Sequence, residues 1–230
     1  MFLKKKILAL VPARGGSKGI KLKNLRKVKG ISLLGHTSEF INKCKLFDEK
    51  LVSTETNKIV NEAYKLKLKI FERSKFTSRD YTSDFEVISE VLNNKKIKEQ
   101  KYDFVVYLQP TSPIRKVSQL INALSLVIKK GYDASWSVSE IDKKFHPKKI
   151  LKISNKKFLS IYVNNGKKIF ARQQLDNVYI RNGIFYIFRV SKFLRSKNIF
   201  LKKNYPSITN YQHVNIDTIQ DLKKIRSLIQ

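Results

Sequence analysis

Cysteine and histidine are scarce in this chain of 230 residues, and their scarcity excludes two kinds of site. Cys44 is the sole cysteine, so no disulfide can form within the chain. The histidines, His36, His146 and His213, are far apart and form no Cys/His cluster with metal-ligand spacing. Cys44 lies at helical spacing among apolar neighbours, which predicts a small buried hydrophobe and not a nucleophile.

Long apolar runs are also missing. No stretch approaches the ~20 apolar residues of a membrane-spanning helix. The start, MFLKKKILALVPARGG, has a basic flank, but its apolar run is too short for a signal peptide and lacks a small-residue cleavage pattern. We therefore expect a cytoplasmic protein with no membrane partner. A hydrophobic content of 42% is enough for one sizeable core, which predicts a single domain over residues 1–230.

Acidic residues are few. The chain has 18 Asp and Glu against 48 Lys and Arg, which gives a formal net charge of +30. Such a charge suits either a nucleic acid or a small anionic substrate. The lysines are spread through every segment, and no arginine-rich stripe or basic and aromatic platform stands out. This distribution favours a small anion, with nucleic acid as the weaker alternative.

Apolar runs and helical patterns alternate along the chain. The predicted strands are 5–13, 50–54, 68–73, 102–109, 133–139 and 182–190, and the predicted helices are 36–47, 55–66, 83–94, 117–131 and 217–229. The helix at 83–94 opens with a capping box of Ser83 and Glu86, and Gly131 closes the helix at 117–131. This order predicts an α/β fold: a Rossmann-like, mostly parallel sheet with helices on both faces. Residues 148–170 predict short antiparallel strands around a turn at 164–166 (NNG), within a small arm at roughly 140–180.

Three polar clusters follow predicted strands, namely ARGGSKG (13–19), STE (53–55) and QPTSPIR (109–115). Ligands of open parallel sheets bind beyond the carboxyl ends of the strands, so we expect all three clusters to line one cleft. In the first cluster, glycine amides can approach phosphate oxygens closely, while Arg14 and Lys23 supply positive charge. The spacing matches neither the P-loop nor the dinucleotide-binding pattern.

Simpler interpretations of several residues stay open at this point. The PTSP group also suits a plain turn after a strand, and Asp217 also suits a helix cap. Arg73 and Arg172 also suit an exposed surface, and Tyr186 lies in an apolar strand and suits a core. Gln109 is harder to explain this way, because an amide in an apolar strand needs hydrogen-bond partners.

A resemblance to a known family unites these segments. VPARGGSKGIKLKNLR (11–26) and LQPTSPIR (108–115) closely resemble two motifs of the acylneuraminate cytidylyltransferases, the CMP-sialic acid synthetases. VSTE, FERS, RQQLDNVYIRNGIFYIF and VNIDTIQDL resemble further family regions in the same order, so the resemblance covers almost the whole chain. The chain departs from the family at Glu55, where Asp is usual, and at Ser74, where Pro is usual.

The resemblance implies a role for each matching position. Arg14, Lys23 and Asp217 would be catalytic, and the nucleotide would contact Ala13, Arg14, Gly15, Gly16, Ser17, Asn24 and Arg73. The sugar acid would contact Gln109, Thr111, Arg172, Asn182 and Tyr186, with Arg172 and Asn182 in an arm that pairs two subunits. Asp217 would bind Mg²⁺ with Asn215, which stands where the family commonly has a second Asp and adds no charge.

The implied reaction transfers CMP from CTP to a 2-keto sugar acid of the sialic, legionaminic or pseudaminic type and releases pyrophosphate. The implied assembly is a homodimer. Two alternatives remain from the sequence. One is another sugar nucleotidyltransferase, which uses a Kdo-type acid or takes UTP or GTP as donor. The other is a non-catalytic nucleotide- or nucleic-acid-binding protein, which only the charge of +30 favours.

Overall fold

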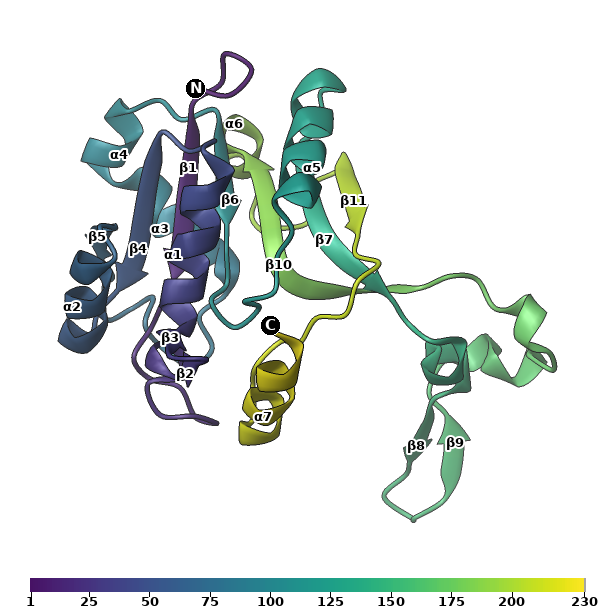
Figure 1. The fold of residues 1–230 in the computed structure, drawn as a ribbon. Helices are drawn as coiled ribbons and strands as arrows, with labels where there is room; N and C mark the ends of the chain where they lie inside the picture. Colours follow the sequence, from purple (N-terminus) through teal and green to yellow (C-terminus); the bar gives the residue numbers. More distant parts are fainter. Residues whose placement is uncertain (230) are drawn as a thin grey trace. The chain divides into compact units, whose positions relative to one another are not determined.

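The structure is a computed structural model that describes residues 1–229. Its main element is a seven-stranded sheet (Figure 1). Across the sheet the strands are β11 (Asn204–Ile208), β7 (Ala134–Glu140), β10 (Tyr179–Arg189), β6 (Phe104–Tyr107), β1 (Ile7–Pro12), β4 (Glu49–Thr54) and β5 (Lys69–Glu72). The neighbours β6, β1, β4 and β5 run parallel, and β10 pairs with β6 antiparallel. The carboxyl ends of these four parallel strands therefore share one edge.

Helices cover both faces of this sheet. They are α1 (Leu33–Cys44), α2 (Asn57–Lys65), α3 (Asp84–Asn93), α4 (Lys95–Glu99), α5 (Val117–Lys129), α6 (Val190–Phe193) and α7 (Ile219–Leu228). Figure 1 shows α1 and α5 in front of the sheet and α3 and α6 behind it. The predicted α/β class, with a mostly parallel sheet and helices on both faces, is confirmed.

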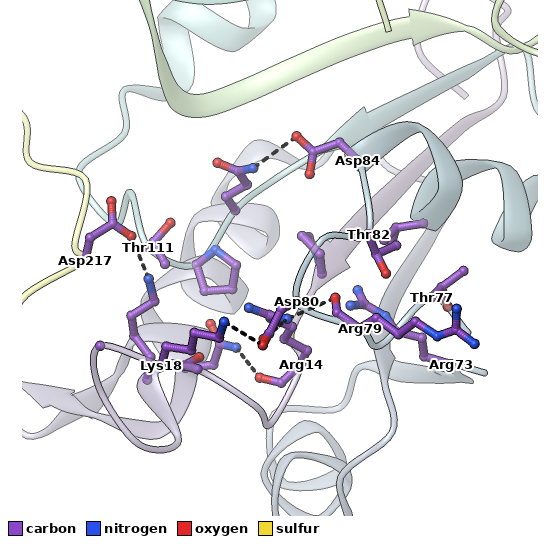
Figure 2. Close-up of a pocket in the computed structure, with 18 of the residues that line it drawn as sticks. Arg14, Lys18, Arg73, Thr77, Arg79, Asp80, Thr82, Asp84, Thr111 and Asp217 are labelled. Atoms are coloured by element: carbon purple, nitrogen blue, oxygen red, sulfur yellow. Dashed lines mark hydrogen bonds and ion pairs between the residues drawn. The ribbon is translucent and has the colours of Figure 1, made fainter. Parts of the chain in front are cut away.

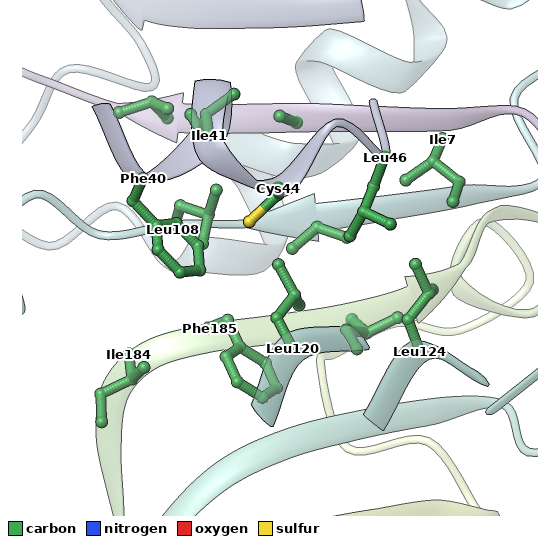
Figure 3. Packing of buried hydrophobic residues seen from close by; sticks show 14 of the residues in the cluster. Ile7, Phe40, Ile41, Cys44, Leu46, Leu108, Leu120, Leu124, Ile184 and Phe185 are labelled. Carbon is green, nitrogen blue, oxygen red and sulfur yellow. The ribbon is translucent and has the colours of Figure 1, made fainter. Parts of the chain in front are cut away.

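The apolar first strand forms because both of its faces are buried. Ile7, Ala9 and Val11 pack in one cluster with apolar side chains of α1 and α5 (Figure 3). Leu8 and Leu10 point the other way, since side chains alternate along a strand, and both are fully buried. A strand buried on both faces is continuously apolar, as this one is.

Aromatic side chains fill the opposite face of the sheet. Phe188 of β10 lies 5.0 Å, ring centre to ring centre, from Phe193 of α6, and Phe193 lies 5.1 Å from Phe85 of α3. The predicted capping box at the start of α3 is confirmed: Ser83 accepts from the Glu86 amide, and Glu86 accepts from the Ser83 amide. It fixes the first turn of α3, which begins with Asp84.

A third cluster joins the N-terminal and C-terminal segments. The hairpin of β2 (Lys27–Val28) and β3 (Ile31–Ser32) and the helix α7 contribute to it. Its buried members are Ile20, Val28, Leu33, Val214, Ile216, Leu222 and Ile225. Thr218 caps α7 and accepts from the Asp221 amide at 3.2 Å, so Asp217 precedes the cap. Within residues 1–229, no helix is both long and apolar enough to cross a membrane.

The chain divides into two compact units. The first comprises Met1–Ser137, Asn182–Ser207 and Tyr211–Gln230, and the second comprises Val138–Arg181 and Ile208–Asn210. The second unit contains an antiparallel pair, β8 (Leu151–Ile153) and β9 (Leu159–Ile161), together with four short 3₁₀ segments. These segments are Lys143–Phe145, Pro147–Lys149, Asn164–Lys168 and Arg172–Gln174.

The predicted turn at 164–166 is wrong, although short antiparallel strands are present. The chain reverses between Ser154 and Phe158, whose backbone groups bond at 2.9 Å, and Lys157 takes a left-handed φ of 60°. Gly166 lies instead in a 3₁₀ segment, where an added Cβ would meet the Lys148 carbonyl oxygen at 2.3 Å. Its glycine serves this close approach and not a hairpin.

Candidate active site

The glycine-rich loop after β1 is held by hydrogen bonds to β4 and to Asn24, and it packs closely against the C-terminal segment. Ala13 is fully buried, and its amide donates to the Ser53 carbonyl at 2.9 Å. Asn24, buried beneath the loop, donates from Nδ2 to the Arg14 carbonyl at 3.0 Å. At Gly19 an added Cβ would lie 2.5 Å from the Asp217 carbonyl oxygen, so this glycine allows the loop and the C-terminal segment to touch.

This loop forms one wall of a pocket of about 520 Å³ at the carboxyl ends of the parallel strands (Figure 2). That volume lies within the usual range of small-molecule sites. The lining residues come from the glycine loop, the segment after β5, the start of α3, the end of β6 and the segment before α7. They are Pro12, Arg14, Ser17, Lys18, Gly19, Lys23, Asn24, Arg73, Thr77, Arg79, Asp80, Thr82, Asp84, Val87, Tyr107, Gln109, Pro110, Thr111, Asn215 and Asp217.

The pocket gathers cations, and two carboxylates pair with them. Asp80 lies 3.0 Å from Arg14 Nη1 through one oxygen and 3.0 Å from Lys18 Nζ through the other. Lys23 Nζ lies 2.8 Å from Asp217 Oδ1. The hydrogen bond from Lys18 lowers the pKa of Asp80 most, burial opposes it, and the charges of Lys18 and Arg14 add to the lowering, so that the pKa lies below its usual value. The carboxylate therefore stays ionised and bridges the glycine loop to the segment after β5.

Arg73 is a buried cation that is only partly satisfied. Its side chain follows β5, is 5% exposed and donates from Nε to Ser53 Oγ at 3.1 Å. Its Nη2 is buried and has no hydrogen-bond partner in the described part of the chain. Burial lowers the pKa of the guanidinium, although the charges of nearby acids oppose this effect. A buried guanidinium nitrogen without a partner in a pocket indicates a site for an acceptor supplied by a ligand.

Another wall of the pocket carries two neutral side chains, Tyr107 and Gln109, and one carboxylate, Asp84. Tyr107, at the end of β6, donates from its hydroxyl to Asp84 Oδ1 at 2.9 Å. Gln109 lies two residues further and contacts Asp84 Oδ2 from Nε2 at 3.5 Å. On the other side of Gln109 lies Gly183 of β10, whose φ of 71° and missing side chain make room for the amide.

Backbone and side-chain bonds fix the loop after β6 to its neighbours. The Ile216 amide donates to the Thr111 carbonyl at 2.8 Å, which places Asn215 and Asp217 beside this loop. Ser112 Oγ donates to the Asn182 carbonyl at 2.9 Å and lies 3.5 Å from Asn215 Oδ1. The loop that carries Gln109 and Thr111 therefore has a defined position relative to the C-terminal segment.

Arg115 supports the same loop from below. It donates to the carbonyl oxygens of Ile184 and Gln109 and to the Thr37 hydroxyl, with its guanidinium 5.6 Å from the Phe40 ring centre. Burial lowers its pKa to about 9. Because its partners are neutral oxygens on three different elements, Arg115 ties the loop to α1 and β10.

Most of the site residues predicted from the sequence meet in this pocket. It brings together Arg14, Ser17, Lys23, Asn24, Arg73, Gln109, Thr111, Asn215 and Asp217. Gly15 and Gly16 belong to the same loop but do not line the pocket, and Ala13 lies in the core beneath it. The individual roles of these residues stay predictions.

Three predicted sugar-binding residues lie elsewhere. Tyr186 is buried, and its ring meets Trp136 edge-on at 5.6 Å between ring centres. Asn182 belongs to the first unit and not to the arm; its side chain is buried and accepts from the Ile184 amide at 3.2 Å. Arg172 lies in the second unit and is exposed. None of the three lines the pocket.

The expected contribution of STE to the pocket is wrong. Ser53 and Thr54 are buried, and Glu55 turns to the outer side of the glycine loop, where it accepts from the Gly15 amide at 2.7 Å. There Glu55 lines a separate hollow with Gly15. An added Cβ at Gly15 would lie 2.0 Å from Thr56 Oγ1, so close packing accounts for this glycine.

The segment after β5 takes the place expected for STE, and sequence reasoning missed most of it. Thr77, Arg79, Asp80, Thr82 and Asp84 all line the pocket. The rule that ligands bind at the carboxyl ends of parallel strands also applies to β5, so this position was available as a signal. Residues 74–83 form no strand or long helix, and no pattern in them shows which side chains turn inward.

The pocket has donors suitable for Mg²⁺. The Asp217 carboxylate is open to it, and the Asn215 amide lies two residues away. Among residues 1–229 there is no group of three or more His, Cys, Asp and Glu side chains that could hold a metal by themselves. Mg²⁺ commonly binds through one or two protein oxygens with waters and substrate phosphates completing the shell, so these donors fit the ion.

Comparisons with known proteins find relatives that match most of this chain. An N-acylneuraminate cytidylyltransferase of Streptococcus agalactiae serotype III is 27% identical over 219 residues, which are 94% of this chain and 51% of the relative. The chain thus spans about half the length of the first curated relatives it matches. A pseudaminic acid cytidylyltransferase of Campylobacter jejuni is 29% identical over 221 residues, which are 95% of this chain and 94% of the relative.

A solved structure and a family model complete the comparison. The structure of a CMP:2-keto-3-deoxy-manno-octonic acid synthetase complexed with CTP aligns with a TM-score of 0.68, covering 97% of this chain and 98% of that one. At 16% identity this likeness concerns the fold. The family model described as cytidylyltransferase matches residues 8–230. The chain therefore belongs to the cytidylyltransferase family.

Proposed function

We propose that this chain transfers CMP from CTP to a 2-keto sugar acid of the sialic, legionaminic or pseudaminic type and releases pyrophosphate. The observation that carries this proposal is the pocket itself. It joins the cationic glycine loop, the Arg73 guanidinium with its unpartnered Nη2, the Gln109 and Thr111 wall and the Asp217 carboxylate on one sheet edge. Relatives that act on acylneuraminate and on pseudaminic acid support the substrate class.

The cationic wall would hold the triphosphate. Arg14, Lys18 and Lys23 already face the pocket, each paired with a carboxylate. A triphosphate as a whole carries more negative charge than a carboxylate, and phosphates bind arginine bidentately, so it can take over the same donors. In the reaction, the anomeric hydroxyl oxygen forms a bond to the α-phosphorus, the bond to pyrophosphate breaks, and the hydroxyl proton is released. Charge grows on phosphoryl oxygens, where fixed cations lower the barrier most.

Mg²⁺ would be held by Asp217, with Asn215 as a neutral ligand beside it. The ion supplies positive charge to phosphate oxygens when it is bound. With one carboxylate instead of two, we expect weaker binding of Mg²⁺ at this position. Lys23, already 2.8 Å from Asp217, keeps a cation next to the same phosphates.

The proposed assembly is a cytoplasmic homodimer. The second unit exposes many large apolar side chains for its size, namely Phe145, Ile150, Leu151, Ile153, Phe158, Leu159, Tyr162, Phe170, Tyr179 and Ile180. Pairing with a second copy would cover them, since monomers rarely expose so many together. Arg172, in this unit, would then be available to the partner's sugar acid. Sedimentation equilibrium of the wild type and of Phe158→Lys tests the assembly: a wild-type monomer refutes it.

Pyrophosphate release tests the reaction. CTP and Mg²⁺ are offered with N-acetylneuraminic, legionaminic, pseudaminic and Kdo acids in turn, with UTP, GTP and ATP in place of CTP as controls. We expect release to need CTP together with one of the first three acids. Release with Kdo only, or with UTP or GTP, establishes another sugar nucleotidyltransferase instead.

A variant and its control tie the reaction to the pocket. Lys23→Ala should lower kcat/KM at least ten-fold, because a cation beside the phosphates is lost. Lys43→Ala removes an exposed lysine of α1 outside the pocket and should leave the rate unchanged. If the folded protein releases no pyrophosphate and instead binds RNA or DNA with an affinity that falls steeply with salt, the nucleic-acid alternative holds.

A further inference from the structure

Asp84 differs from the other carboxylates of the pocket. Asp80 and Asp217 are paired with lysine or arginine, whereas Asp84 contacts only neutral groups. Figure 2 shows Asp84 away from Arg14 and Lys18. Asp84 lies in the first turn of α3, where the helix dipole stabilises a negative charge. A carboxylate without a cation in this pocket therefore has another task.

Tyr107 fixes the Asp84 carboxylate. The ring is buried at the end of β6, and its hydroxyl donates to Asp84 Oδ1 at 2.9 Å. Burial, and then the nearby Asp84 charge, raise the pKa of Tyr107 well above its usual value. The hydroxyl thus stays protonated and remains a donor, so one oxygen of Asp84 is occupied. The second oxygen, Oδ2, faces Gln109.

The Gln109 amide is confined from both sides. Its Nε2 lies 3.5 Å from Asp84 Oδ2, and its Oε1 lies 2.6 Å from where a Cβ of residue 183 would stand. Only a glycine at 183 leaves that space. A carboxylate accepts hydrogen bonds and cannot donate them, so it favours the amide orientation with nitrogen toward Asp84. The second N–H of Nε2 has no acceptor within residues 1–229 and is available to a ligand.

We propose that Asp84 is a positioning residue that holds Gln109 as a hydrogen-bond donor to an oxygen of the sugar acid. This inference rests on the proposed function. A free amide can offer either its oxygen or its nitrogen to the pocket, but beside Asp84 it offers nitrogen. The best acceptor on a 2-keto sugar acid is its carboxylate, because hydrogen bonds to charged groups are the stronger ones. The Asp84 and Gln109 pair therefore selects for the acid end of the substrate.

Kinetics of Asp84→Asn test the proposal. An asparagine at this position can turn its own N–H toward Gln109, which then rotates and presents oxygen to the sugar acid. We expect the KM for the sugar acid to rise roughly 10- to 100-fold, the range for losing a hydrogen bond to a charged group, while the KM for CTP changes less than two-fold. Glu86→Gln is the matched control: it removes one charge from the same turn of α3, keeps the capping box and does not line the pocket.

A double-mutant cycle separates action through Gln109 from a direct or structural effect. In a Gln109→Ala background, Asp84→Asn should change the KM for the sugar acid by less than two-fold. Effects that multiply, or a rise in the KM for CTP as large as that for the acid, overturn the proposal.

A spectroscopic readout keeps the test independent of turnover. The side-chain amide signals of Gln109 in a ¹⁵N spectrum, assigned by their loss in Gln109→Ala, should move in Asp84→Asn and stay in place in Glu86→Gln. If the wild type shows no turnover, the proposed function fails, and this spectrum still decides whether Asp84 orients Gln109. Unmoved signals in Asp84→Asn overturn the inference.

Discussion

Replacing Arg73 by methionine should weaken the binding of CTP without destabilising the free protein, because this guanidinium adds little to the free energy of unfolding. The substitution removes one hydrogen bond to Ser53 Oγ, about 1 kcal/mol, and relieves the burial of a cation whose Nη2 has no partner. The two effects oppose each other, so the free energy of unfolding without ligand should be unchanged or rise by about 1 kcal/mol. Loss of a charge-assisted hydrogen bond to the nucleotide, worth about 2 kcal/mol, should raise the Kd for CTP roughly 30-fold.

Linked binding makes the effect visible in unfolding experiments. At a CTP concentration 100 times the wild-type Kd, the nucleotide adds about 2.7 kcal/mol to the stability of the wild type. With a Kd raised roughly 30-fold, the same concentration adds only about 0.9 kcal/mol. Urea denaturation with and without CTP and Mg²⁺ measures both values, and calorimetric titration measures the Kd directly.

A second buried arginine provides the control. Arg115 donates to three oxygens, so Arg115→Met should lower the free energy of unfolding by about 2 kcal/mol or more, with or without CTP. The reasoning is refuted if Arg73→Met destabilises the free protein as much as Arg115→Met does and leaves the Kd for CTP unchanged. Arg73 would then be a structural residue, and its unpartnered Nη2 would carry no information about a ligand.

Three further outcomes follow from the structure. Gly183→Ala places a methyl group 2.6 Å from Gln109 Oε1 at a φ of 71°, so kcat/KM should fall at least ten-fold and Tm should drop; unchanged kinetics contradict this. Asp217→Asn should raise the Mg²⁺ concentration for half-maximal rate about ten-fold or more, and an unaltered Mg²⁺ titration places the ion elsewhere. Burial raises the pKa of Cys44 to about 12, so a thiol reagent at pH 8 should react only after denaturation; rapid reaction of the native protein contradicts this.

Local patterns account for what could be predicted of the fold. The buried run of β1, the capping box at Ser83 and the glycine after α5 each act within a few residues, and the structure has them as expected. The strand-edge rule then placed the glycine loop and the QPTSP segment in one pocket without knowledge of any contact. The place of a loop at the sheet edge can be predicted from the sequence because the strands and helices beside it have periodic apolar patterns.

Long-range contacts account for what could not be predicted. The NNG sequence that ends at Gly166 is typical of a hairpin turn, but this glycine is instead needed because the Lys148 carbonyl packs closely against it. Asn182 lies near the arm in sequence, yet its side chain is buried in the first unit against its own strand. In the sequence Asp84 is an ordinary acidic residue at the start of a helix, and its contact with Tyr107 at the end of β6 is seen only in the structure. Each depends on a neighbour that no local pattern specifies.

Cations and carboxylates are paired in the pocket, although the chain as a whole has far more basic than acidic residues. In a chain with 18 acidic residues, three of them lie in this pocket, and two of these bridge or pair with Arg14, Lys18 and Lys23. Unpaired, these cations would repel one another and spread apart. The carboxylates hold them close together before a ligand arrives, which reduces the reorganisation that binding requires. On the proposed function, a triphosphate that displaces the carboxylates would meet cations already close together. The local pairing of acids with cations, and not the net charge of +30, is therefore the electrostatic feature that bears on function.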